Sequence, residues 1–216
     1  MCSSDLKYNK NMISLLFSSP LAFILIFGGL LMSIALHEYA HCWAADRLGD
    51  PTPRSKGRLT LDPRVHLDLL GTAMILFTRF GWGKPAPFDP YNLKDPVRDT
   101  ALIAAAGPIS NIAVALVLSA ILHLGLLPLA ILQVAIFQVM AINIMLAVFN
   151  LVPVYPLDGS RILTAILPKE TALEYEQVMR RYGTIVLLFL IFPFNGVSPV
   201  SQLLSPVINM ILGWLI

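Results

Sequence analysis

Histidine and glutamate, which build many hydrolytic zinc sites, occur together in the pentapeptide HEYAH at 37–41. If this peptide is helical, His37 and His41 lie one turn apart on the same face, so both imidazoles can bind one zinc ion. Glu38 between them is then placed to accept a proton from a water molecule that the metal activates, and to deliver it to a leaving amine. The spacing therefore predicts a metalloprotease-type zinc site with His37 and His41 as ligands and Glu38 as catalytic acid and base.

A catalytic zinc site needs a third protein ligand. The candidates are Asp46, Asp50, Asp62, His66, Asp68, His123 and Asp158. Asp46 follows His41 by five residues and falls on the wrong side of a helix. The acids at 50, 62 and 68 lie among arginines, where we expect solvated surface positions. The histidine at 66 is expected to be a hydrogen-bonded interfacial residue, and the one at 123 a packed neutral residue.

Asp158 differs from the other candidates because it adjoins the stretch 101–157, which contains no Asp, Glu, Lys or Arg, and stands on a turn rich in proline and glycine. Its alternative role is to cap a helix over 159–167, and the two roles are compatible. We predict Asp158 as the third zinc ligand. Asn150 either presents its amide to the reacting carbonyl oxygen or caps a helix end. Arg161 either clamps substrate or pairs with lipid phosphate.

Long apolar runs must hold these residues. The chain of 216 residues is 56% hydrophobic and 13% charged, whereas soluble domains carry about 25% charged residues. Residues 12–36 contain no charge and lead directly into HEYAH. We therefore expect a membrane helix that continues to about Leu48 and ends at Gly49-Asp50-Pro51, with Pro20 and Gly28-Gly29 as candidate bends.

The uncharged stretch 101–157 is long enough for two membrane spans divided near 125–128. Within it, the cluster at 107–111 (GPISN) indicates close helix packing and a kink, and Asn111 and Asn143 are expected to face the protein interior. The shorter run 67–80 suits a tilted or re-entrant segment, 160–181 a polar helix, and 182–216 one or two final segments. We predict an all-α polytopic membrane protein with five or six transmembrane segments, forming a single domain over 1–216, with disorder expected in 1–10.

Residues 51–66 are basic and contain proline and glycine, with a short alternating stretch at 57–61. This pattern predicts a small membrane-associated β-hairpin after the first zinc-binding helix. The basic residues that follow HEYAH are Arg47, Arg54, Lys56, Arg58 and Arg64. Because cytoplasmic loops are enriched in lysine and arginine, we expect the active site to lie towards the cytoplasmic face.

Taken together, HEYAH, AAGPISN (105–111) and FNLVPVYPLDGSR (149–161) resemble the site-2 protease family of intramembrane zinc metalloproteases. The likeness extends through GRLTLDPRVHLDLLGT (57–72) and GWGKPAPF (81–88), and covers nearly the whole chain from about residue 20. The resemblance is to the compact prokaryotic subgroup of the family, because we expect no room in the chain for a PDZ or CBS domain. The resemblance implies one zinc ion per chain on His37, His41 and Asp158, with Glu38 as acid and base and Asn150 positioning substrate or stabilising the oxyanion.

The same resemblance implies an endopeptidase in a bacterial or archaeal cell membrane that cleaves transmembrane helices of other proteins near the cytoplasmic face. Its partners would be transmembrane substrates and the lipid bilayer. The net charge of +2 indicates no nucleic-acid surface. The alternative is a non-proteolytic membrane protein that binds or transports metal, but such a protein would carry acidic or histidine residues in several spans, whereas 101–157 contains only His123. The sequence does not indicate an oligomeric state or a substrate.

Overall fold

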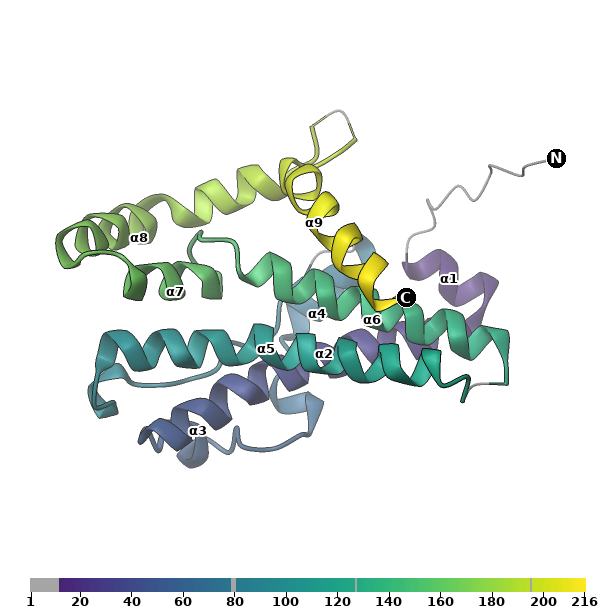
Figure 1. The fold of residues 1–216 in the computed structure, drawn as a ribbon, viewed down its shortest axis with the longest axis horizontal. Helices are drawn as coiled ribbons and strands as arrows, with labels where there is room; N and C mark the ends of the chain where they lie inside the picture. Colours follow the sequence, from purple (N-terminus) through teal and green to yellow (C-terminus); the bar gives the residue numbers. More distant parts are fainter. Residues whose placement is uncertain (1–11, 79–80, 127, 195) are drawn as a thin grey trace.

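The computed structural model describes residues 12–78, 81–126, 128–194 and 196–216, and this part of the chain is mostly α-helical (Figure 1). The expected disorder of 1–10 lies outside the described residues. The α-helices are α1 (Met12–Ser18), α2 (Pro20–Leu48), α3 (Thr52–Ser55), α4 (Leu69–Thr78), α5 (Pro96–His123), α6 (Ala130–Asn150), α7 (Asp158–Ile166), α8 (Lys169–Ile191) and α9 (Pro199–Leu215). Two short 3₁₀ turns, η1 (Pro63–Val65) and η2 (Pro90–Asn92), lie in the connections.

Three described helices, α2, α5 and α6, are long and apolar enough to cross a membrane. The expectation of five or six transmembrane segments is therefore not confirmed. α4 has 10 residues, which at about 1.5 Å per residue cover only half of a hydrocarbon core of about 30 Å. α9 is apolar but has only 17 residues, and the first half of α8 carries most of the charges of the predicted polar helix.

α2 holds HEYAH and has the predicted C-terminal end. Gly49 adopts a left-handed conformation with φ 110°, and its N–H donates to the carbonyls of Ala45 and Asp46, which closes the last turn. Pro20 separates α2 from α1, whereas the helix runs through Gly28 and Gly29 without a break. A Cβ at Gly29 would collide with Val139 of α6, so this glycine permits close helix contact instead of a bend.

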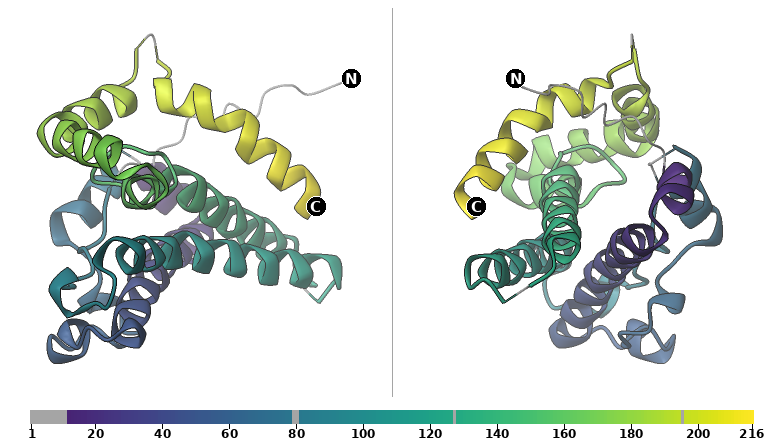
Figure 2. Two further views of the ribbon diagram at one scale, coloured as in Figure 1. Left: turned by 60° about the vertical axis from the view of Figure 1, so that its left-hand side comes forward. Right: turned by 90° about the vertical axis from the view of Figure 1, so that its right-hand side faces the viewer.

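α5 packs against both α2 and α6, and α7 lies against α5. α9 crosses the outer side of α6 and also contacts α8 (Figure 2). Between α5 and α6 the buried side chains of Ala115, Met140 and Ile144 form an apolar core. Because the chain returns from α6 to α7 beside α5, the residues around 158 are brought next to the second half of α2.

The predicted β-hairpin is wrong for the described residues. Residues 57–61 pair with no other strand, and the antiparallel bridge in this region joins Leu67 to Gly83. The reason is local: the Asp62 carboxylate accepts the Arg64 N–H at 3.0 Å and starts the η1 turn, while Pro63 has no N–H to donate to a ladder.

Candidate metal centre

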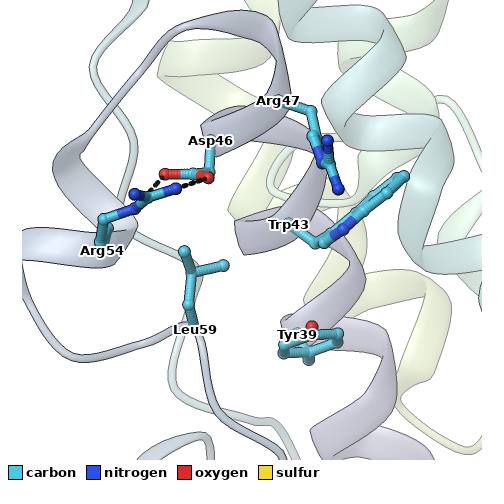
Figure 3. A pocket seen from close by; sticks show the side chains of 6 residues that line it. All are labelled: Tyr39, Trp43, Asp46, Arg47, Arg54 and Leu59. Carbon is cyan, nitrogen blue, oxygen red and sulfur yellow. Dashed lines mark hydrogen bonds and ion pairs between the residues drawn. The ribbon is translucent and has the colours of Figure 1, made fainter.

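The second half of α2 presents two faces, and one of them lines a cavity of about 500 Å³. Its walls are Tyr39, Trp43, Asp46, Arg47, Arg54 and Leu59 (Figure 3). Asp46 accepts two hydrogen bonds from Arg54, at 3.0 and 2.6 Å. Residues 39, 43 and 46 lie nearly opposite His37 and His41 on a helix with 3.6 residues per turn. The cavity is therefore separate from the predicted zinc ligands.

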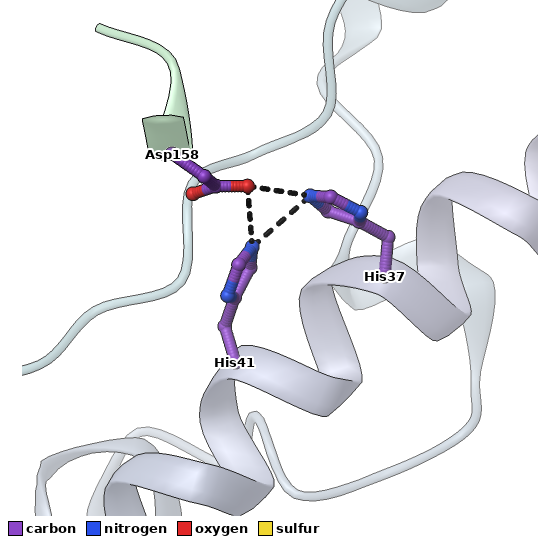
Figure 4. Close-up of side chains that lie close together, drawn as sticks. All are labelled: His37, His41 and Asp158. Atoms are coloured by element: carbon purple, nitrogen blue, oxygen red, sulfur yellow. Dashed lines mark hydrogen bonds and ion pairs between the residues drawn. The ribbon is translucent and has the colours of Figure 1, made fainter. Parts of the chain in front are cut away.

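On the other face of α2, His37 and His41 meet Asp158 from the start of α7 (Figure 4). The two Nε2 atoms are 3.0 Å apart, and Asp158 Oδ2 lies 3.2 Å from the first and 3.3 Å from the second. All three residues are buried, with exposed fractions of 6%, 6% and 8%. The three residues predicted as ligands are thus the group in the described chain whose donor atoms lie close enough to hold a metal ion.

The hydrogen bonds around the two imidazoles set which nitrogens face Asp158. His41 Nδ1 lies 2.7 Å from the Ile103 carbonyl oxygen, and because a carbonyl only accepts, this nitrogen carries the proton. His37 Nδ1 lies 2.6 Å from Asn111 Oδ1 and donates likewise. In the neutral rings both Nε2 lone pairs therefore point at the carboxylate.

This arrangement fits a cation. Three acceptor atoms converge, and Asp158 Oδ2 is a buried oxygen with no hydrogen-bond partner among the described residues. Two imidazole nitrogens and one carboxylate oxygen form a three-ligand set typical of catalytic zinc, which leaves a fourth position for water.

Asp158 does not cap α7 with its side chain: Leu157 is the N-cap residue and Asp158 is the first residue of the helix. α5 approaches the centre through Gly107, where a Cβ would collide with His41 Nε2 and His37 Cε1. The motif at 107–111 predicts close helix packing and a kink. The structure adds that this glycine packs against both imidazoles.

The two predicted catalytic residues are placed differently. Glu38 is half-buried on α2, forms no hydrogen bond with another described residue, and lies beside Gly83, whose added Cβ would be 3.4 Å from Glu38 Cγ. Asn150 ends α6 and donates its amide to the Leu146 carbonyl at 2.9 Å. Its catalytic role therefore stays a prediction.

The other acidic candidates have partners of their own. Asp46 and Asp62 pair with nearby arginines, and Asp68 accepts the Gly71 N–H at 2.7 Å at the start of α4. The predicted surface position of Asp50 is wrong, since this residue is 0% exposed. Its carboxylate accepts hydrogen bonds from Thr52, Asn92 and the Asp89 N–H, because the segment before α5 folds back over the end of α2.

The remaining histidines lie apart from the centre. His66 is 0% exposed, its Nε2 lies 2.8 Å from the Thr60 carbonyl oxygen, and burial lowers its pKa. His123 Nδ1 lies 3.0 Å from the Ser119 carbonyl oxygen within α5. Arg161 stacks over Phe88, with its guanidinium carbon 4.9 Å from the ring centroid. None of these three belongs to the group formed by His37, His41 and Asp158.

Comparison with known proteins shows the family of the chain. Residues 128–191 match the family described as Peptidase family M50. The chain is 37% identical over 188 residues to the Bacillus subtilis protein named as zinc metalloprotease YwhC, covering 83% of this chain and 84% of the relative. It is 31% identical over 198 residues to the Mycobacterium tuberculosis protein named as zinc metalloprotease Rip2, covering 89% and 70%. No solved structure matches the chain. The chain therefore belongs to peptidase family M50, the site-2 protease family of zinc metalloproteases that its motifs resemble.

Proposed function

We propose that this protein is a zinc-dependent endopeptidase that hydrolyses peptide bonds within or next to transmembrane helices of other proteins. The observation that carries the proposal is the convergence of His37, His41 and Asp158, all buried, with Glu38 on the same helix as the two histidines. We assign one zinc ion per chain to this centre. All 216 residues are assigned to one membrane-embedded protease domain.

The position of the centre along α2 supports cleavage inside the bilayer. His37 and His41 lie 7 to 11 residues before Leu48, or about 10 to 17 Å along the helix axis. The centre therefore lies within the length of a membrane-spanning helix, before its C-terminal end. The basic residues that follow this end favour the cytoplasmic side.

When bound, the zinc ion supplies a Lewis acid that brings the pKa of water to about 7. Glu38 is the base: its carboxylate accepts the proton of the attacking water and later donates it to the nitrogen of the leaving amine. This assignment is supported by its place on the ligand helix and by the lack of a competing hydrogen bond with the described residues. Asn150 would have to release the Leu146 carbonyl and donate to the reacting carbonyl oxygen.

Substrate is the second part of the proposal. A peptide bond inside a helix is shielded by its own hydrogen bonds, so a transmembrane substrate must unwind locally to reach the centre. The alternative function, metal binding or transport without hydrolysis, needs polar groups along several spans. In the described part of the chain His37, His41 and Asp158 are the one group that could hold a metal, which favours the enzyme.

The test compares wild type with Glu38→Gln, both loaded with zinc and reconstituted with labelled single-span proteins. We expect equal zinc content and a cleavage rate at least about 100-fold lower for the variant. Equal cleavage by both proteins would exclude Glu38 as the base, and wild type that binds zinc without cleaving any substrate in a broad panel would favour the alternative.

A further inference from the structure

A buried chain of amide side chains leads from His37 into two other membrane helices. Asn111 of α5 places Oδ1 2.6 Å from His37 Nδ1, and its Nδ2 donates to Asn143 Oδ1 of α6 at 2.9 Å. Asn143 Nδ2 in turn donates to Ser33 Oγ of α2 and to the Val139 carbonyl, both at 2.8 Å. Asn111 and Asn143 are 0% exposed and Ser33 is 2% exposed.

In this network of side chains, the direction of every hydrogen bond is fixed by groups that only accept. The Val139 carbonyl cannot donate, so it must face the NH₂ group of Asn143, which turns Asn143 Oδ1 towards Asn111. That oxygen requires the NH₂ group of Asn111, whose Nδ2 also lies 3.4 Å from the Ser33 carbonyl oxygen. Asn111 must therefore present Oδ1 to His37, and His37 must carry its proton on Nδ1.

Both hydrogens of each amide and the Ser33 hydroxyl, which donates to the Gly29 carbonyl at 2.7 Å, have acceptors. A fully satisfied network of this kind is stable in an apolar interior, and a flipped amide would leave unpaired polar atoms. His41 needs no such network, because the Ile103 backbone carbonyl fixes its Nδ1 directly. The orientation of His37 is thus fixed by side chains, and that of His41 by a backbone carbonyl.

We propose that Asn111 and Asn143 are positioning residues of the metal centre: Asn143 orients the Asn111 amide, and Asn111 holds His37 in the tautomer and rotation that direct its Nε2 at the ion. The inference rests on the assignment of the ion to this centre in the proposed function. It also means that α6 acts on the centre without contributing a ligand, since Asn143 touches His37 only through Asn111.

The experiment measures metal binding to purified, metal-free protein in detergent micelles, with no substrate present. Zinc affinity is determined by competition with a chromophoric chelator, and Co²⁺ is added as a probe whose visible spectrum reports ligand geometry. Loss of an outer hydrogen bond to a ligating histidine typically lowers metal affinity 10- to 100-fold. We expect Asn143→Leu to lower zinc affinity by about 10-fold and to change the Co²⁺ spectrum.

A pair of double variants separates positioning from helix packing. In Asn111→Asp the carboxylate accepts the His37 Nδ1–H with either oxygen and needs no partner to orient it. Asn143→Leu should therefore cost nothing further in the Asn111→Asp background, although it costs about 10-fold in wild type. If Asn143→Leu lowers affinity equally in both backgrounds, or in neither, Asn143 is a packing residue and the proposal is wrong.

Ser119→Ala is the matched control, because it removes a buried hydroxyl of α5 that donates to the Leu215 carbonyl and does not contact the centre. It should leave zinc affinity unchanged, and thermal unfolding of the metal-free proteins shows which variants are folded. Ser33→Ala introduces no bulky or polar group and removes one acceptor of the Asn143 amide. It should therefore lower zinc affinity by less than Asn143→Leu does. None of these readouts depends on proteolysis: a chain that binds zinc but cleaves nothing would still test the positioning role.

Discussion

Gly107 of α5 lies directly against the imidazole of His41, so closely that a Cβ on this glycine would overlap His41 Nε2. The same Cβ would also meet His37 Cε1. Gly107→Ala should therefore push both ligand rings away from Asp158. We expect zinc affinity to fall by at least about 10-fold, as for other changes that misorient ligating histidines, measured by chelator competition.

Gly28→Ala is the control for that substitution, because a Cβ at Gly28 in α2 would have no other helix or side chain of the described residues within 4 Å. It should leave zinc affinity unchanged and raise helix stability slightly. Equal zinc binding by Gly107→Ala and wild type would mean that the rings are not confined by α5.

Asp158→Ala should remove the third ligand while leaving the fold intact, since the α7 N-cap is Leu157 and does not depend on this carboxylate. We expect the zinc content of the purified protein to fall well below one ion per chain, with helical circular dichroism unchanged. Unchanged zinc stoichiometry would exclude Asp158 from the ligand set. The next residue to replace would then be buried His66, whose Nδ1 has no hydrogen-bond partner in the described part of the chain.

Spacing and sequence context predicted the three residues that the structure brings together, because zinc chemistry limits the choice of ligands. Two histidines at i and i+4 on a helix allow few arrangements, and Asp158 stood out as an acid beside a long uncharged run. Asn111 and Asn143 were expected to face the interior, and both are fully buried. Their connection to His37 was not predicted, because an amide in an apolar helix carries no sequence signal of the partner that it orients.

The prediction for Asp50 is wrong because residues far away in the sequence surround this side chain. The charged neighbours of Asp50 indicated a surface position, but its donors include Asp89 and Asn92, about forty residues later. The β-hairpin predicted in 51–66 is absent for the local reason that Asp62 and Pro63 start the η1 turn, and the bridge at Leu67 is formed with Gly83. The described part of the apolar run 67–80 is the short helix α4, which packs against α1 and at 10 residues suits the re-entrant alternative better than a span.

Asp50→Asn should destabilise the protein by about 1–3 kcal/mol, the cost of leaving buried donors without a charged acceptor. Burial raises the pKa of Asp50, but hydrogen bonds from Thr52, Asn92 and the Asp89 amide lower it by more. A folded pKa below the unfolded value of about 3.9 means that this stability is fully present above that value and is lost as the pH falls through the folded pKa.

Thermal unfolding of wild type and Asp50→Asn as a function of pH measures this effect. The difference between the two proteins should be largest near neutral pH and should shrink in acid. Asp62→Asn is the control, because the Asp62–Arg64 pair lies at the surface, and it should change stability little. A difference that is constant with pH would show that Asp50 acts through packing and not through its charge.

Gly83→Ala tests whether the segment beside Glu38 holds the base in place. A Cβ at Gly83 would lie 2.8 Å from Ile34 Cγ2, 3.2 Å from the His66 carbonyl oxygen and 3.4 Å from Glu38 Cγ. Either the segment at Gly83 or the Ile34 side chain must therefore shift. A small misplacement of a catalytic group can cost about 100-fold in rate. Because His37, His41 and Asp158 are not touched, we expect kcat to fall at unchanged zinc affinity. Gly213→Ala, with open space around its Cβ, should change neither quantity, and loss of zinc from Gly83→Ala would place this glycine among the residues that support the metal instead.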